Sequence, residues 1–124
     1  MIRVPHGGND DAWLDSTHVH AYFARYFNYF SQPKYYNFDY GYRADWKCDL
    51  IVLCSSYYEQ YQNDLAKLLA KIDIERNAAT ELIAYLTAVK PPRSRLKEAM
   101  TPITVVARVN VIAGWVGREI FTQK

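Results

Sequence analysis

Hydrophobic side chains recur every three or four residues through the middle of the chain. The series comprises Trp46, Leu50, Cys54, Tyr57, Tyr61, Leu65, Leu68 and Ile72. This spacing places one side chain per turn on one face and predicts an amphipathic helix over residues 45–72, with Asp45 as its N-cap. A second helical pattern reaches residue 89, so residues 45–89 form one helix or two. We expect a turn near residues 73–77.

The first 44 residues change pattern twice. Residues 1–12 contain a proline and two adjacent glycines, which predict an irregular lead-in. A helix is expected from about residue 16 to residue 31, before Pro33, because the aromatic residues there follow helical spacing. Residues 32–44 then alternate rings with polar residues, as in YYNFDYGYR. A period of two indicates an extended arm, lying on a helical surface of this chain or of a partner.

The C-terminal third gives two conflicting signals. Residues 90–97, KPPRSRLK, predict a basic linker, since two consecutive prolines exclude a helix. In residues 103–116 the alternation of β-branched side chains favours a strand. The spacing of Val105, Val109, Ile112 and Val116 favours a helix, as does the preceding Thr-Pro pair, and we interpret the segment as a helix. The expected fold is therefore a single all-α domain over residues 1–124, with three or four helices and the aromatic arm between the first two.

Composition supports a globular chain and gives little indication of a partner. Of the 124 residues, 50% are hydrophobic and 23% are charged, which excludes a disordered chain. The net charge of +2 is small but unevenly distributed. Residues 90–124 carry seven basic and two acidic side chains, whereas residues 1–89 carry eight and eleven. Basic charge is therefore concentrated at the C-terminal end.

Cys48 and Cys54 do not have the spacing of a metal or redox motif. On the predicted helix they lie on different sides, so we expect free, mostly buried thiols. The N-terminus has no signal-peptide pattern, and the longest apolar stretch is too short and too polar for a membrane span. These features predict a soluble intracellular protein of a reducing compartment, either the cytoplasm or an organelle matrix.

No motif of a catalytic site or a cofactor site is present. The sequence contains neither a glycine-rich phosphate loop nor a GxSxG or HExxH motif. His18 and His20 suggest a metal pair, but on the expected helix they lie about 200° apart and cannot share an ion. We therefore expect no metal, no cofactor and no enzymatic activity. A thiol nucleophile assisted by a distant histidine is the third-ranked interpretation of function.

The aromatic segment of residues 22–42 contains seven Tyr and four Phe. Eleven such rings represent on the order of 2,000 Å² when buried, against roughly 1,600 Å² for a standard protein–protein interface. The phenylalanines fit a core, whereas the later tyrosines fit an interface, where one end of the ring is dry and the other is wet. The chain thus presents more ring surface than its own core is expected to cover.

The function that follows is a non-catalytic protein–protein interaction protein, such as an accessory subunit, an inhibitor or an adaptor. The predicted anchors are Tyr35, Tyr36, Phe38, Tyr40, Tyr42 and Arg43, and the predicted electrostatic rim is Lys90, Arg93, Arg95 and Lys97. Its partner is another protein, a larger assembly, or a second copy bound through the stripe of residues 46–72. The alternative is a single-stranded nucleic-acid binder that stacks bases on the same rings.

Overall fold

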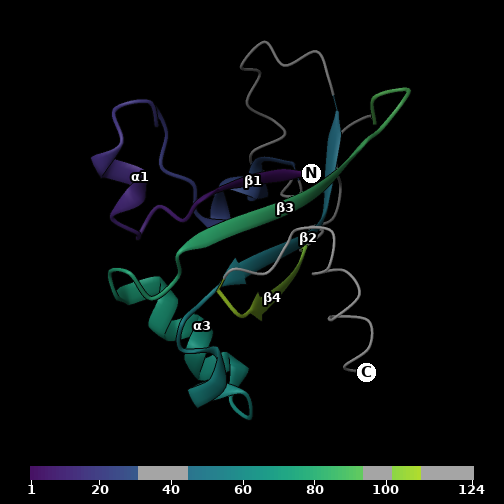
Figure 1. The fold of residues 1–124 in the computed structure, drawn as a ribbon. Helices are drawn as coiled ribbons and strands as arrows, with labels where there is room; N and C mark the ends of the chain where they lie inside the picture. Colours follow the sequence, from purple (N-terminus) through teal and green to yellow (C-terminus); the bar gives the residue numbers. More distant parts are fainter. Residues whose placement is uncertain (31–44, 94–101, 110–124) are drawn as a thin grey trace.

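The computed structural model describes residues 1–30, 45–93 and 102–109, and these residues form a four-stranded mixed β-sheet with short helices (Figure 1). The prediction of an all-α bundle is therefore wrong. None of the helices within these three ranges is long and apolar enough to cross a membrane.

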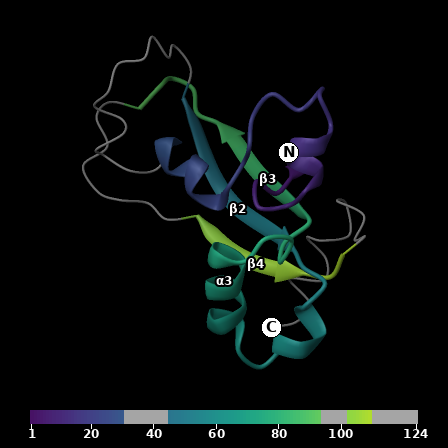
Figure 2. The same ribbon diagram turned by 90° about the vertical axis from the view of Figure 1, so that its left-hand side faces the viewer.

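The strands are ordered β1-β3-β2-β4 across the sheet. They comprise β1 (Ile2–Pro5), β2 (Trp46–Cys54), β3 (Glu81–Ala88) and β4 (Ile103–Ala107). β3 pairs antiparallel with both β1 and β2, whereas β4 runs parallel to β2. Figure 2 shows β2 between β3 and β4. The order places the two longest strands, β2 and β3, in the centre of the sheet.

The burial of β2 on both faces explains its continuous run of apolar residues. Residues 50–54 read LIVLC, and Ile51, Val52, Leu53 and Cys54 are all 3% exposed or less. A strand that is covered on both sides needs no polar alternation, so its sequence resembles that of a buried helix. This ambiguity is the physical reason why the helical interpretation of residues 45–72 fails.

An irregularity in β2 sends its two cysteines to opposite faces of the sheet. The pairing with β3 shifts register between Cys48 and Leu50. A separation of six residues in a regular strand would place both thiols on the same face. With one extra residue in the strand, Cys48 joins one apolar cluster and Cys54 joins the other. Both thiols are free and buried, which confirms that prediction.

Within the described residues, four short helices accompany the sheet. They are α1 (Asp11–Leu14), the 3-10 helices η1 (Ala24–Phe30) and η2 (Tyr58–Tyr61), and α3 (Leu65–Ile74). The α3 helix begins at a side-chain cap, because Asp64 accepts a hydrogen bond from the Lys67 backbone N–H at 3.1 Å. It ends at a turn in which Asn77 has a positive φ of 61°. The turn predicted near residues 73–77 is thus confirmed.

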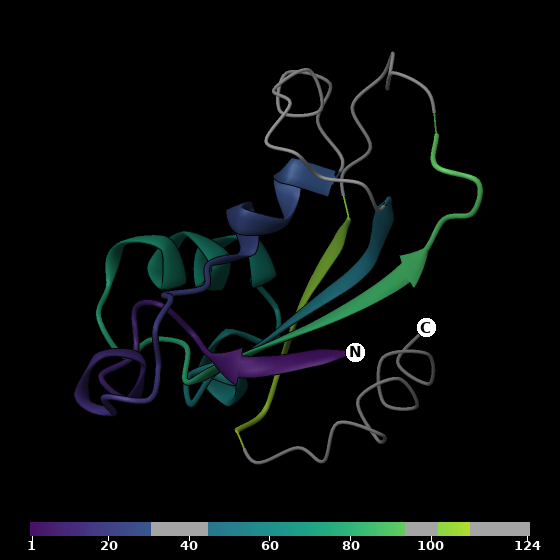
Figure 3. The same cartoon turned by 90° about the horizontal axis from the view of Figure 1, so that it is seen from above.

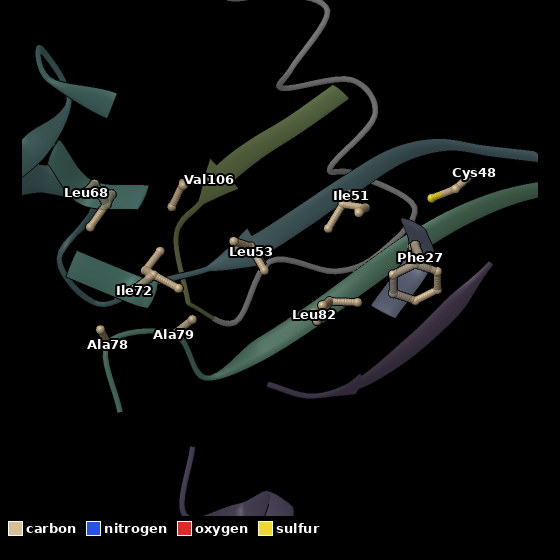
Figure 4. Packing of buried hydrophobic residues seen from close by; sticks show 11 residues of the cluster. Phe27, Cys48, Ile51, Leu53, Leu68, Ile72, Ala78, Ala79, Leu82 and Val106 are labelled. Carbon is tan, nitrogen blue, oxygen red and sulfur yellow. The ribbon is translucent and has the colours of Figure 1, made fainter. Parts of the chain in front are cut away.

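The main core lies between the sheet and the two helices that cover one of its faces. Figure 3 shows η1 and α3 on the same side of the sheet. Phe27 of η1 and Leu68 of α3 are both 1% exposed or less, and they join alternate side chains of the strands, including Ile51 and Leu82 (Figure 4). Val52, Cys54, Ile83 and Ala107 form a second buried cluster on the opposite face. The sheet is therefore an internal layer.

Several other expectations need correction. Residues 1–12 are not irregular, since they contain β1 and the start of α1. Of the helix expected at 16–31, the structure describes residues 16–30, and only 24–30 of these are helical. The segment beginning at residue 103 starts as a strand, because the backbone of β4 pairs with that of β2. The 46–72 stripe spans a strand and two helices, with Leu68 and Ile72 buried, so it is not a helix face that can pair with a second copy.

Candidate interaction surface

Most residues predicted to bind a partner lie outside the described part of the chain. These are Tyr35, Tyr36, Phe38, Tyr40, Tyr42 and Arg43 of the arm, and Arg95 and Lys97 of the linker. The two described members, Lys90 and Arg93, differ in their surroundings. Lys90 is exposed, whereas the Arg93 side chain is only 22% exposed and bonded to other parts of the chain.

Arg93 forms an ion pair with Asp45, the residue that precedes β2. The Arg93 Nε donates to Asp45 Oδ2 at 2.8 Å, and Nη2 donates to Oδ1 at 2.9 Å. The Arg93 backbone N–H also donates to Oδ2 at 2.8 Å. This two-pronged geometry between guanidinium and carboxylate is the strongest form of a protein ion pair. It replaces the predicted role of Asp45 as a helix N-cap.

The same guanidinium connects both flanks of the aromatic arm. Its Nη2 donates to the carbonyl oxygens of Phe30 and Trp46, each at 3.3 Å. Phe30 is the last described residue before residues 31–44, and Asp45 is the first after them. The Arg93 charge that we predicted for a docking rim is therefore paired with a buried carboxylate of this chain. We name this group of contacts the Arg93 clamp.

The clamp also determines the protonation of Asp45. Hydrogen bonds from the Arg93 side chain hold the pKa of Asp45 below its ordinary value of 3.8, against the opposing effect of burial. The Asp45 side chain is only 4% exposed. A buried carboxylate stays ionised only when it is paired in this way. The Asp45 charge is thus part of the structure at neutral pH.

The two elements that the clamp joins, η1 and β2, carry exposed aromatic side chains. Tyr26 and Tyr29 of η1 are 41% and 46% exposed, and Trp46 at the start of β2 is 38% exposed. Phe27, between the two tyrosines, is 1% exposed and lies in the core. The expectation that the phenylalanines of this segment lie in the core holds for Phe27 but not for Phe23, which is 45% exposed. Large amphipathic rings at a fixed position are typical of binding surfaces.

A groove lies at a different place, between α1, the start of η1 and the end of α3. Its volume is about 410 Å³, and we name it the Trp13 groove. It is lined by Gly7, Gly8, Trp13, Phe23, Ile72, Asp73, Ile74, Glu75 and Arg76. Trp13 is 69% exposed, Phe23 is 45% exposed and Ile74 is 84% exposed. Clefts with aromatic walls and a few charged groups are common ligand sites.

Two hydrogen bonds order the segment that forms the floor of the groove. Trp13 Nε1 donates to the Gly7 carbonyl oxygen at 2.8 Å, which fixes the indole ring although most of it is exposed. The Gly8 backbone N–H donates to His6 Nδ1 at 3.1 Å. His6 therefore carries its ring proton on Nε2 when neutral. Burial lowers the pKa of His6, and the nearby Asp73 charge opposes this effect only in part.

Gly7 has no side chain because Phe23 occupies the space. A Cβ at Gly7 would lie 2.4 Å from Phe23 Cε2, which is far inside van der Waals contact. The Gly7 backbone N–H also donates to the Tyr22 carbonyl oxygen at 2.7 Å. The absence of a side chain at Gly7 thus lets the ring of Phe23 lie against the backbone.

The thiols and histidines do not form a preorganised catalytic centre in the described residues. Burial raises the pKa of both Cys48 and Cys54 to about 11, so neither is a ready nucleophile at neutral pH. His18 and His20 are not helical, and both line a smaller cavity of about 190 Å³. Among residues 1–30, 45–93 and 102–109, no group of three or more His, Cys, Asp or Glu side chains is arranged to hold a metal ion.

Sequence reasoning missed both Asp45 and Trp13. Asp45 and Arg93 are 48 positions apart, so no local spacing relates them. Trp13 lies among acidic residues, directly after residues 1–12, which we expected to be irregular. The signal available in the sequence was an isolated tryptophan six positions after Gly7, and it becomes meaningful only when the Nε1 hydrogen bond is known.

Comparison with known proteins adds no relative. The chain matches no protein-family model, no curated protein and no solved structure. The class defined by the coordinates is a small domain built on a four-stranded mixed sheet. Function is therefore inferred from the geometry of this chain alone.

Proposed function

We propose that this chain is a non-catalytic protein–protein interaction protein, such as an accessory subunit, an inhibitor or an adaptor, that docks through the aromatic arm. The observation that supports the proposal most directly is the Arg93 clamp with its exposed aromatic neighbours. The clamp holds both flanks of the arm in one place, and the elements that it joins, η1 and β2, carry the exposed rings of Tyr26, Tyr29 and Trp46. Binding to a preordered surface costs less conformational entropy than binding to a loose segment.

Within this proposal the anchors are those of the arm, with Tyr26, Tyr29 and Trp46 as additional contacts. Lys90 is exposed and remains a candidate for the rim, together with Arg95 and Lys97. Arg93 acts by positioning and does not bind the partner. We assign the protein to an intracellular, reducing compartment, a proposal supported by two free and buried thiols.

Affinity capture of the tagged full-length chain from its natural source, followed by mass spectrometry, tests this function. The test variant is Tyr36→Ala/Tyr40→Ala, and the matched control is Leu65→Ala/Ile103→Ala, which removes exposed apolar side chains elsewhere. We expect the test variant to lose partner proteins that the wild type and the control retain. If the double tyrosine variant retains every partner, docking through the arm is wrong.

Salt dependence separates protein partners from nucleic acid. Capture is repeated across a series of salt concentrations. A phosphate-binding interface weakens steeply and linearly in the logarithm of salt concentration, because counterions are released. An interface built on aromatic side chains changes little. A steep dependence together with recovered nucleic acid would favour the alternative function, in which the same rings stack on bases.

A further inference from the structure

The Trp13 groove combines a fixed aromatic surface with exposed carboxylates. Trp13 is 69% exposed, yet its Nε1 is already bonded to the Gly7 carbonyl oxygen at 2.8 Å. The indole face, not its polar edge, is therefore what the ring presents to a ligand. Phe23 contributes a second ring, held against Gly7. An aromatic face carries negative quadrupole density, which attracts cations.

The acidic groups of the groove have the charge that a cation requires. Asp73 and Glu75 both line it. Asp73 is 63% exposed, and its counterion is Arg25 at 3.7 Å, a side chain that is itself 84% exposed. An exposed ion pair of this kind contributes little to stability, so another cation can readily replace Arg25. Asp73 is thus available to a second cation, whereas Glu75 is held more tightly by Lys71 at 2.7 Å.

The remaining charge on the lining is Arg76, whose guanidinium is paired with Asp10. Arg76 therefore does not neutralise Asp73. The apolar surface of Ile74 continues the groove beyond the two rings. A ligand that suits all three features has a flat cationic head and an apolar stem. An arginine side chain has both, because its guanidinium stacks on aromatic rings and its methylene groups pack on apolar surface.

We propose that the Trp13 groove binds an arginine side chain of a polypeptide partner, with the guanidinium stacked on Trp13 and hydrogen-bonded to Asp73. Arg25, the present counterion of Asp73, competes with this ligand. The site uses neither the arm nor the Arg93 clamp, so this proposal is independent of docking through the arm.

The test uses the full-length chain and three acetylated, amidated pentapeptides of the form Gly-Ser-X-Ser-Gly. X is arginine, citrulline (a neutral analogue of nearly the same shape) or glutamate. Binding is followed by backbone and indole N–H chemical shifts in NMR titrations. We expect the arginine peptide to shift the Trp13 indole signal and to bind roughly twofold to thirtyfold more tightly than the citrulline peptide. The glutamate peptide should bind most weakly.

Three variants locate the site. Asp73→Asn should weaken binding of the arginine peptide severalfold, and Trp13→Leu should weaken it at least as much. Arg25→Gln should strengthen it, because the competing cation is removed. This last variant alters an exposed side chain only, so it keeps the test valid if Trp13→Leu fails to fold. Glu59→Gln, at an exposed acid outside the groove, is the control and should change nothing.

The inference is overturned if the arginine and citrulline peptides bind equally, or if Arg25→Gln weakens binding. It is also overturned if the shifted signals lie outside the groove, or if no saturable binding occurs below roughly 10 mM peptide. Loss of partners by the arm variant in affinity capture has no bearing on these outcomes, since the peptides are tested on an intact groove.

Discussion

The guanidinium of Arg93 and the carboxylate of Asp45 meet through two nearly equal hydrogen bonds, at 2.8 and 2.9 Å, at the same end of the central strand pair β2 and β3. Asp45 precedes β2, and Arg93 follows β3. The backbone strengthens the contact, since the Val89 N–H donates to the Asp45 carbonyl oxygen at 2.9 Å. The pair therefore closes the end of the sheet at which β2 begins and β3 ends.

Replacing Arg93 should destabilise the fold more than replacing an exposed arginine. Arg93→Gln leaves the Asp45 carboxylate buried without its charged partner, which we expect to cost about 2–4 kcal/mol in the free energy of unfolding. The matched control is Arg3→Gln, because Arg3 pairs with Glu81 at 2.7 Å with both side chains about one-third exposed. That change should cost about 1 kcal/mol or less. Urea denaturation measures both, and equal losses would contradict the structural role of the clamp.

The clamp should also make stability depend on pH. The pKa of Asp45 is lower in the folded chain than its ordinary value, so the unfolded chain binds the proton first as pH falls. The stability contributed by the ionised carboxylate is thus complete above pH 3.8 and is lost as pH decreases through the lower, folded pKa.

Denaturation midpoints measured from pH 6 downward test this dependence. We expect the wild type to lose stability below about pH 4 more steeply than the double variant Arg93→Gln/Asp45→Asn, which lacks the pair. Parallel curves for the two chains would mean that other carboxylates account for the acid sensitivity. Asp49, whose pKa is also lowered, mainly by the Thr87 hydroxyl, is present in both chains and cancels in the comparison.

The helical prediction failed where burial removed the distinguishing signal. The series from Trp46 to Ile72 follows helical spacing, but it passes from β2 through η2 into α3. Only its last part, Leu65, Leu68 and Ile72, lies on one helix. In β2 and β3 both faces are covered, so the alternation that marks a strand is absent. The unbroken LIVLC and LIA runs were the better signal, since strands of this kind are short and continuously apolar.

Local features could be predicted, whereas long-range contacts could not. The turn at residues 73–77 and the buried thiols depend on neighbouring residues and on composition, and both are confirmed. The Arg93 clamp and the Trp13 groove join segments dozens of residues apart. Charged and aromatic residues occur throughout the chain, so no spacing rule identifies which of them meet. Their proximity follows from the strand order β1-β3-β2-β4.

The division of aromatic residues within η1 gives a direct test of the core. Phe27 is 1% exposed, so Phe27→Ala should lower the free energy of unfolding by about 3–5 kcal/mol through loss of burial and the cavity left behind. Tyr29 is 46% exposed, and Tyr29→Ala should cost about 1 kcal/mol or less. Thermal unfolding of the two variants and the wild type measures both losses in stability. A larger loss of stability for Tyr29→Ala than for Phe27→Ala would contradict the assignment of the Phe27 face of η1 to the core.

Gly7→Ala should be destabilising because of one identified collision. The new methyl group would lie 2.4 Å from the Phe23 ring, and relieving the overlap should cost about 1–3 kcal/mol. Gly8→Ala is the matched control, since its closest neighbour is His6 Nδ1 at 3.2 Å, a contact that a small shift relieves.

A double-mutant cycle shows whether Phe23 is the cause. Removal of the ring by Phe23→Ala should make the Gly7→Ala change nearly neutral, so the two changes couple by most of the cost of Gly7→Ala alone. The urea-induced unfolding of all four chains gives this coupling energy. Additive losses would show that the sensitivity of Gly7 comes from its backbone conformation and not from the ring above it.

The two thiols should react slowly in the folded chain, for two physical reasons. Their pKa of about 11 leaves roughly a thousandth of each as thiolate at pH 8, and both side chains are buried. We expect iodoacetamide to modify the native chain at a rate limited by unfolding, and to modify the chain in urea rapidly. Mass spectrometry of timed samples measures both rates.

Because Cys48 and Cys54 lie on opposite faces of the sheet, their native rates should be similar only if global unfolding exposes both. Faster labelling of Cys48 alone would indicate that one face opens separately, and rapid labelling of either thiol in the native chain would contradict the burial of β2.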